Sequence, residues 1–472
     1  MAMVTMSTER PQPAAAAAAP VTTEHPLLSR PILPTLARLS VPNVAAMMAT
    51  ALVAIAETAY VGLLGIPQLA GIALVFPMVM LQQMMSAGAM GGGVSSAISR
   101  ALGAGDVARA ETLVRHAMII GLTMGAIFTA VFLTLGPGIF RLLGGRGAAL
   151  EQALAYANVA FLGSIAICLT NTLASVLRGT GNMRVPSAVL LVLAALQIVL
   201  GGALGLGVGP LPRLGMSGIA LGQVIAFLGG ASFLVWHLAS GRARVRLRLS
   251  GGLQWSMFRD ILKVGAVACV SPVQSVATVL LVTAMVSRFG TEMLAGYGIG
   301  ARLEFLLVPI TFAIGVASVP MVGMAIGAGN VARARRVAWT AGGLAAGLIG
   351  AIGVVVALAP DLWSRLFTDN LGVLSAARTY LTIAGPAYTF LGLGLALYFA
   401  SLGSGKIVGP VLAQSLRLLV IAIGGWWLNA VGGSATAFFA LVGVSLFAYG
   451  AAAFLAVWLV RWGPASNSQK GN

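Results

Sequence analysis

The sequence consists mainly of long apolar runs that are joined by short polar connections. Hydrophobic residues make up 59% of the 472 residues and charged residues only 8%, whereas a soluble domain carries about 25% charged residues. Each run exceeds the roughly 20 residues that a helix needs to cross a bilayer. Twelve runs are found, at 35–64, 68–98, 107–136, 148–178, 184–207, 215–239, 257–288, 293–326, 331–359, 374–403, 408–430 and 433–461. We therefore predict an all-α polytopic membrane protein with twelve transmembrane helices.

The net charge of +17 follows the connections rather than a nucleic-acid surface. Most Lys and Arg residues fall in connections on the side of the N-terminus, so the positive-inside rule places both termini in the cytosol. A multi-pass protein of a bacterial-type plasma (inner) membrane is expected. No basic patch is interleaved with aromatic residues, so no nucleic-acid partner is expected. The three His residues show no metal-ligand spacing, and neither a metal, a cofactor nor an enzyme is expected.

The chain is an internal duplication. GAGDVARA at 103–110 returns as GAGNVARA at 327–334, and RGTGNMRVP at 178–186 returns as LGSGKIVGP at 402–410, both at an offset of 224 residues. We predict two six-helix lobes related by a pseudo-two-fold axis along the membrane normal, with a substrate cavity between them. The predicted division is a disordered cytosolic tail (1–34), a first lobe (35–239), a basic cytosolic linker (240–256), a second lobe (257–461) and a cytosolic tail (462–472).

The first run contains one acid, Glu57. Asn43, Thr50 and Glu57 are spaced seven residues apart, which places them on one face of a helix. A carboxylate inside a membrane is costly and usually faces the bundle interior or water. Glu57 is therefore the candidate ion-coupling residue, and a packed structural Glu is the alternative.

Only one other acid, Glu304, lies deep in an apolar run. Arg302 is two residues away and points to a different helix face, whereas Arg417 of the eleventh run lies at a matching depth. We predict a buried Glu304–Arg417 pair in a secondary charged site that includes Arg302. Glu304 binding a substrate cation, or packing against backbone, are the alternatives.

A few uncharged polar or aromatic residues also lie in the apolar runs. They are candidates for the lining of a substrate cavity, although hydrogen bonding between helices is the more common role of Gln and Asn in membranes. These candidates are Asn43, Thr50, Tyr60, Gln82, Gln83, Asn171, Gln197, Gln274, Ser275 and Tyr388.

The first-span acid with the VGLLG turn, the paired GAG(D/N) loops and the paired GxGxxxxP segments resemble the multidrug and toxic compound extrusion (MATE) family over residues 35–460. The resemblance implies a two-lobed exporter of organic cations and amphipathic compounds that works by alternating access and is driven by protons or sodium ions. The family's first-span acid is usually Asp, and here it is Glu57.

The resemblance also bears on the coupling ion and on rival functions. Some sodium-using members carry acids in spans seven and ten, where this chain has Ser275 and Leu391. A proton is therefore the expected coupling ion, with sodium as the alternative. A flippase for a lipid-linked precursor is the rival function, but it would be expected to have a more basic cavity. A monomer surrounded by membrane lipids is expected.

Overall fold

The structure is a computed structural model that describes residues 26–248 and 250–463, and the described residues form helices and no strands. The first half contains α1 (Pro26–Ser29), α2 (Ile32–Leu64), α3 (Ile66–Gln83), the π-helix η1 (Met84–Met90), α4 (Gly91–Gly103), α5 (Val107–Leu142), α6 (Gly147–Leu162), α7 (Ser164–Gly179), α8 (Arg184–Leu206) and α9 (Gly215–Ala239). The second half contains α10 (Trp255–Ala268), α11 (Val270–Val286), the 3₁₀ helix η2 (Ser287–Phe289), α12 (Thr291–Gly327), α13 (Val331–Leu358), α14 (Asp361–Ser364), α15 (Leu371–Ala384), α16 (Tyr388–Ser404), α17 (Val408–Ala430) and α18 (Ala435–Leu459).

These helices confirm the predicted spans. Ten are long and apolar enough to cross a membrane, and two bent pairs bring the number to 12 when each pair counts as one span. The pair α6 and α7 bends by 49° at Gly163, and the pair α15 and α16 bends by 56° next to Pro386. Because glycine lacks a side chain and proline lacks an N–H group, both residues allow a helix to break at these points.

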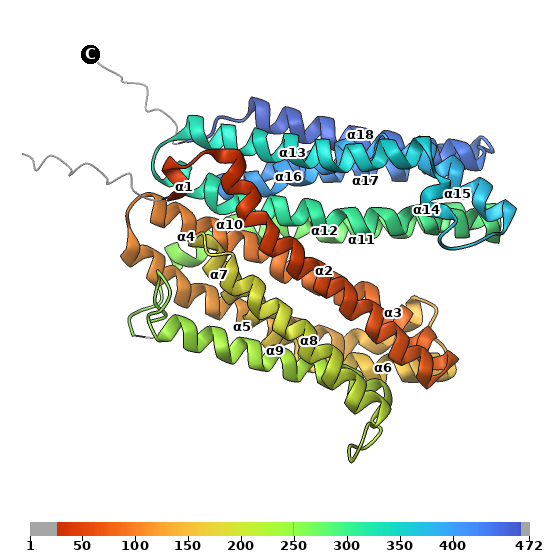
Figure 1. Cartoon of the computed structure of the whole chain (residues 1–472), viewed down its shortest axis with the longest axis horizontal. Coiled ribbons are helices and arrows are strands. Elements are labelled where there is room, and N and C mark those ends of the chain that lie inside the picture. The colour runs from red at the N-terminus through yellow and green to blue at the C-terminus, as the bar shows by residue number, and fades with distance from the viewer. Residues whose placement is uncertain (1–25, 249, 464–472) are drawn as a thin grey trace, which may run out of the picture.

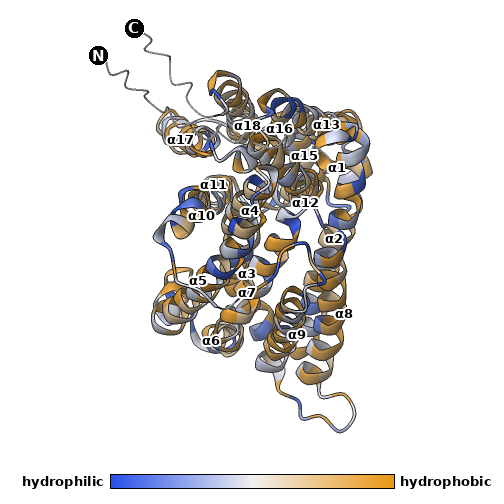
Figure 2. Cartoon of the chain, turned by 90° about the vertical axis from the view of Figure 1, so that its left-hand side faces the viewer, coloured by the Kyte–Doolittle hydropathy of each residue, from blue (hydrophilic) through white to orange (hydrophobic). Residues whose placement is uncertain are grey.

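The helices form two groups that meet at one end and diverge towards the other (Figure 1). Pro26 and Gly463, the outermost described residues, lie at the end where the groups meet, which we call the tail end. Figure 2 looks onto the tail end and shows mostly apolar helix surfaces around both groups. This arrangement suits a lipid environment, because no apolar surface needs to be hidden from hydrocarbon.

The duplicated sequence gives matching contacts at the tail end. A methyl group added to Gly103 on α4 would collide with the backbone of Met324 on α12, and one added to Gly327 on α12 would collide with the backbone of Arg100 on α4. Each contact maps onto the other at the offset of 224 residues. The two halves therefore touch backbone to backbone around a local pseudo-two-fold axis, as small residues allow in membrane proteins.

The first helix of each half packs, at the tail end, against the opposite half. Leu36 of α2 belongs to an apolar cluster with Ile314 of α12 and Ala338 of α13. Ile261 of α10 belongs to the cluster that contains Val94 of α4. The helices α2 and α10 therefore tie the lobes together instead of belonging wholly to one of them.

The structure corrects two features of the predicted division. Residues 26–34 were expected to be disordered, but α1 and the start of α2 are helical here, because Leu27 and Leu36 pack into the second-half cluster. Trp462 was expected in the C-terminal tail and is only 6% exposed in the same cluster. Residues 1–25 and 464–472 lie outside the described part of the chain.

The linker at 240–256 is attached to α5 rather than only solvated. Arg115 donates hydrogen bonds of 2.5 Å to the carbonyl oxygens of Ser250 and Gly252, and the backbone N–H of Gln254 donates to Nε2 of His116 at 2.9 Å. Arg248 also pairs with Glu111 at 3.0 Å. The linker therefore joins α9 and α10 along a defined path.

Candidate functional site

Glu57 lies on the face of α2 that meets α8. Its Oε1 accepts a hydrogen bond of 2.8 Å from Nε2 of Gln197 on α8. The hydroxyl group of Tyr156 on α6 also interacts with this carboxylate. A carboxylate with donors of this kind is stabilised by them inside an apolar bundle, where an unpaired charge would be costly.

A second amide extends this group. The Tyr156 hydroxyl donates to Oε1 of Gln223 on α9 at 3.5 Å, and both side chains are buried. Glu57, Tyr156, Gln197 and Gln223 therefore link α2, α6, α8 and α9 within the first lobe. The sequence analysis named Glu57 and Gln197 but missed Tyr156 and Gln223. Gln223 could have been found, since it is a Gln within a predicted span.

The polar face of α2 follows the α2–α8 interface. Asn43 is buried, and its Oδ1 accepts a hydrogen bond of 3.2 Å from the hydroxyl group of Ser187 on α8. Thr50 is exposed and donates to Ala46 of its own helix. The ring of Tyr60 lies against Gly202 on α8, so closely that a methyl group there would be 2.9 Å from it. Asn43 and Glu57 therefore bind across one helix pair, and Thr50 does not join them.

The second half lacks a counterpart of this carboxylate. At the offset of 225 residues that relates Gly65 to Gly290, Glu57 corresponds to Val282; at the offset of 224, Gln197 corresponds to Ile421. Val282 and Ile421 are both buried in one apolar cluster of the second lobe. The fold therefore accepts an apolar pair at this position, and the carboxylate–amide pair is a special feature of the first lobe.

A further polar group surrounds the π-helix η1 of the first lobe. Nδ2 of Asn171 on α7 donates to Oε1 of Gln83 at 2.9 Å and to the Ser86 hydroxyl at 2.8 Å. Gln82 is buried, with Nε2 3.9 Å from Sγ of Cys168 on α7. Gln82, Gln83 and Asn171 therefore form one interhelical group, separate from Glu57. A π-helical turn is often found at functional sites.

The polar residues of α11 face α17 in the second lobe. Nε2 of Gln274 donates to the Ser415 hydroxyl at 2.6 Å, and Nε2 of Gln414 donates to the Ser275 hydroxyl at 3.1 Å. Gln274 and Ser275 thus hold two helices together, as Asn43 does for α2 and α8.

Glu304 has a tyrosine partner rather than the predicted arginine. Its Oε1 accepts a hydrogen bond of 2.5 Å from the hydroxyl group of Tyr380 on α15, and Tyr297 packs edge-on against the Tyr380 ring at 5.3 Å. The Tyr388 hydroxyl is buried beside them without a hydrogen bond of its own. Glu304 therefore lies among three tyrosines.

The predicted Glu304–Arg417 ion pair is not formed in the described part of the chain. Arg417 on α17 is near enough to act electrostatically on Glu304, but it is not among the ion pairs within 4.0 Å. Tyr380 occupies the position of the direct partner. Arg302 is outside the site, because its exposed side chain stacks on the Phe367 ring at 5.3 Å.

No group of three or more His, Cys, Asp or Glu side chains suited to a metal ion occurs within residues 26–248 and 250–463. The chemistry that remains at Glu57 and Glu304 is the gain and loss of a proton, or the binding of a cation by one carboxylate with neutral donors.

Comparison with known proteins places this geometry in a family. The MatE family model matches residues 42–202 and 268–428. The FAD transporter of Shewanella oneidensis is 26% identical over 321 residues, 66% of this chain and 69% of that protein. The probable multidrug resistance protein NorM of Deinococcus radiodurans is 29% identical over 411 residues, 84% of this chain and 88% of that protein.

Solved structures share the fold. A MOP superfamily transporter from Pyrococcus furiosus superposes with a TM-score of 0.83 at 22% identity, over 92% of this chain and 96% of that one. The Vibrio cholerae MATE transporter VcmN in its bent form gives 0.82 at 21% identity, over 90% and 96%. The two family-model matches also coincide with the two halves of the duplication. The chain therefore belongs to the MatE family, and it is a membrane transporter rather than an enzyme.

Proposed function

We propose that this protein is a secondary active multidrug exporter of organic cations and amphipathic compounds, and that Glu57 couples export to the entry of a proton. The observation that carries the proposal is the Glu57–Gln197 hydrogen bond of 2.8 Å between α2 and α8, in a position that the second half fills with two apolar residues. Relatives whose names say multidrug resistance cover most of the chain.

The physical argument concerns one proton. Ionised Glu57 accepts hydrogen bonds from Gln197 and Tyr156, whereas protonated Glu57 carries no charge and gains a donor of its own. The two forms therefore favour different packing of α2 on α8. Because α2 also packs on α12 and α13, a change at Glu57 acts on the contact between the lobes.

Dye efflux from proteoliposomes tests this proposal. An imposed pH gradient and an imposed sodium gradient are compared for the wild-type protein, Glu57→Gln and Glu304→Gln. We expect efflux that follows the pH gradient and is lost in Glu57→Gln, since Gln cannot release a proton. Glu304→Gln is the matched control.

Activity that survives Glu57→Gln would contradict the proposal and direct attention to Glu304. Efflux driven by sodium would point to sodium as the coupling ion. Absence of efflux for every cationic dye would favour a flippase.

A second substrate class, an anionic flavin nucleotide, is favoured by Arg178 at the C-terminal end of α7. Arg178 is 3% exposed, and no described acid pairs with it. It lines a cavity of about 10 Å³ between the halves with Ser95, Val316 and Phe399, and Nε of Arg178 and the Ser95 hydroxyl have no hydrogen-bond partner. One relative is named as an FAD transporter.

The repeat supplies the test of this second class, because Leu402 occupies the position of Arg178 in the second half. If an anion is exported, Arg178→Leu lowers FAD efflux at least about tenfold, the loss expected when a charge-assisted contact is removed. Efflux of cationic dyes serves as the control. Equal loss for both substrate types would instead mark Arg178 as structural.

A further inference from the structure

The paired motifs GAGDVARA and GAGNVARA build the same turn in both halves. Gly105 and Gly329 have φ of +78° and +74°, which favours glycine, and each precedes a capping residue. Oδ1 of Asp106 accepts from the backbone N–H of Arg109 at 2.8 Å, and Oδ1 of Asn330 accepts from that of Arg333 at 2.9 Å. The turns therefore fix the first turns of α5 and α13, which carry Arg109 and Arg333.

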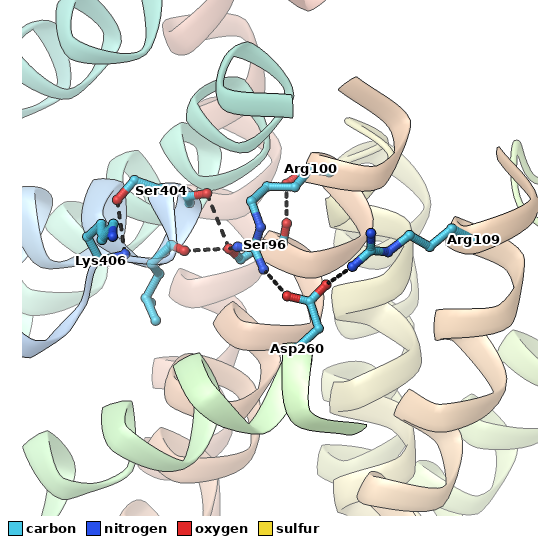
Figure 3. Close-up of polar contacts among 9 residues, drawn as sticks. Ser96, Arg100, Arg109, Asp260, Ser404 and Lys406 are labelled. Carbon is cyan, nitrogen blue, oxygen red and sulfur yellow. Dashed lines mark hydrogen bonds and ion pairs between the residues drawn. The ribbon is translucent and has the colours of Figure 1, made fainter. Parts of the chain in front are cut away.

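In the first half, this turn reaches Asp260 on α10. Arg109 pairs with one carboxylate oxygen of Asp260 at 3.0 Å, and Arg100 on α4 pairs with the other at 2.8 Å (Figure 3). Figure 3 also shows Ser96 between Arg100 and the end of α16. The Ser96 hydroxyl donates to the carbonyl oxygen of Leu402 and accepts from Arg100. One carboxylate from the second half is thus held by two arginines from the first.

In the second half, the matching arginine reaches back to the first. Nε and Nη2 of Arg333 donate to the carbonyl oxygen of Leu27 at 3.1 and 2.9 Å, and Nη2 also donates to that of Arg30 at 2.6 Å. These carbonyl groups lie directly before α2. Each motif arginine therefore holds the start of the first helix of the opposite half.

We infer that Arg109 with Asp260, and Arg333 with the α1 segment, form two clamps that keep the lobes together at the tail end and release when that end opens. The inference rests on the proposed alternating-access export. The clamps lie where the lobes touch through Gly103 and Gly327, so separation of the lobes there must break both. The first clamp is ionic and the second uses backbone carbonyl groups, so a charge change acts on the first alone.

Cysteine labelling at Ser99 tests the first clamp. Ser99 on α4 is fully buried, and its hydroxyl lies against Gly323 of α12, between the halves. The native thiols are removed as Cys168→Ala and Cys269→Ala, and Ser99→Cys is labelled with a hydrophilic maleimide. We expect Asp260→Asn and Arg109→Gln to raise the labelling rate roughly fivefold, because an ion pair of this partly exposed kind shifts an equilibrium by about that factor.

The matched control is Asp361→Asn. Asp361 also bridges two arginines, Arg378 at 2.6 Å and Arg365 at 3.4 Å, but it lies between α13 and α15 at the end opposite the tail end. We expect this variant to leave labelling at position 99 unchanged. Arg109 has a 46% exposed side chain, so Arg109→Gln folds even if Asp260→Asn does not.

The second clamp is tested by Arg333→Gln and by deletion of residues 2–31, which removes α1. A protein lacking residues 2–25 is the control, because it keeps the carbonyl groups of Leu27 and Arg30. We expect Arg333→Gln and the longer deletion to raise labelling at position 99, and the shorter deletion to leave it unchanged.

Labelling does not depend on transport, so the outcomes are separable. If wild-type efflux is absent but Asp260→Asn and Arg333→Gln accelerate labelling, the clamps hold and the proposed function is wrong. If neither variant changes the labelling rate and both lower only the melting temperature, the contacts are structural and the inference is wrong.

Discussion

The pairing of Glu57 with Gln197 sets different expectations for single and double variants. In Gln197→Ile the carboxylate loses its 2.8 Å donor, and we expect a loss of about 1–3 kcal/mol in stability. In the double variant Glu57→Val with Gln197→Ile, the first lobe carries the apolar pair found at Val282 and Ile421, so we expect most of that stability to return without efflux.

Thermal unfolding in detergent measures the stabilities, and proteoliposome efflux measures activity. A double variant that is less stable than Gln197→Ile would show that the two lobes pack differently at this position. At this scale, sequence reasoning found Glu57 because an acid stands out in an apolar run. It missed Tyr156, because a tyrosine in a span carries no such signal, and it paired Glu304 with Arg417 because depth along a helix does not reveal that Tyr380 is nearer.

At the scale of the element, hydropathy and the repeat predicted the twelve spans, because the bilayer fixes helix length and polarity. The bend at Gly163 was not predicted, since glycines are common throughout this chain and only packing shows which one breaks a helix. The helical start at 26–34 was also missed, because its order comes from contacts with residues nearly 300 positions away in the sequence.

The short helix α14 gives a prediction about pH. The hydrogen bonds from Arg378 lower the pKa of Asp361 below the usual value of 3.8, so this pair stabilises the fold above about pH 3.8 and stops doing so as the pH falls through the lowered value. We expect Asp361→Asn to have a lower melting temperature than the wild type at pH 7 and an equal one in strong acid. A difference that persists there would mean that the side-chain shape, not the charge, matters.

At the scale of the whole molecule, the repeat predicted two lobes and their pseudo-two-fold relation, but not that α2 and α10 each pack on the opposite half. That crossing depends on Leu36 and Ile261, which look like any other apolar residue in a span. The glycines at the axis were visible in the repeated motif, yet only the structure shows that Gly103 and Gly327 touch backbone.

This contact predicts the effect of one methyl group. Alanine favours a helix over glycine by about 1 kcal/mol, but in Gly103→Ala the methyl group meets the Met324 backbone. We expect Gly103→Ala to lower the melting temperature and to speed labelling at position 99. Gly343→Ala on α13, where nothing lies within 4 Å, is the control and should be neutral or stabilising. Similar behaviour of the two variants would contradict a close contact at the axis.

The crossed packing of α2 has a consequence for biogenesis. A ribosome makes α2 first, but the residues that cover Leu36, on α12 and α13, are made almost 300 residues later. The start of α2 therefore waits in the membrane without its final neighbours while most of the chain is inserted. The first half cannot complete its own tail end alone, and maturation of the protein is tied to synthesis of its second half.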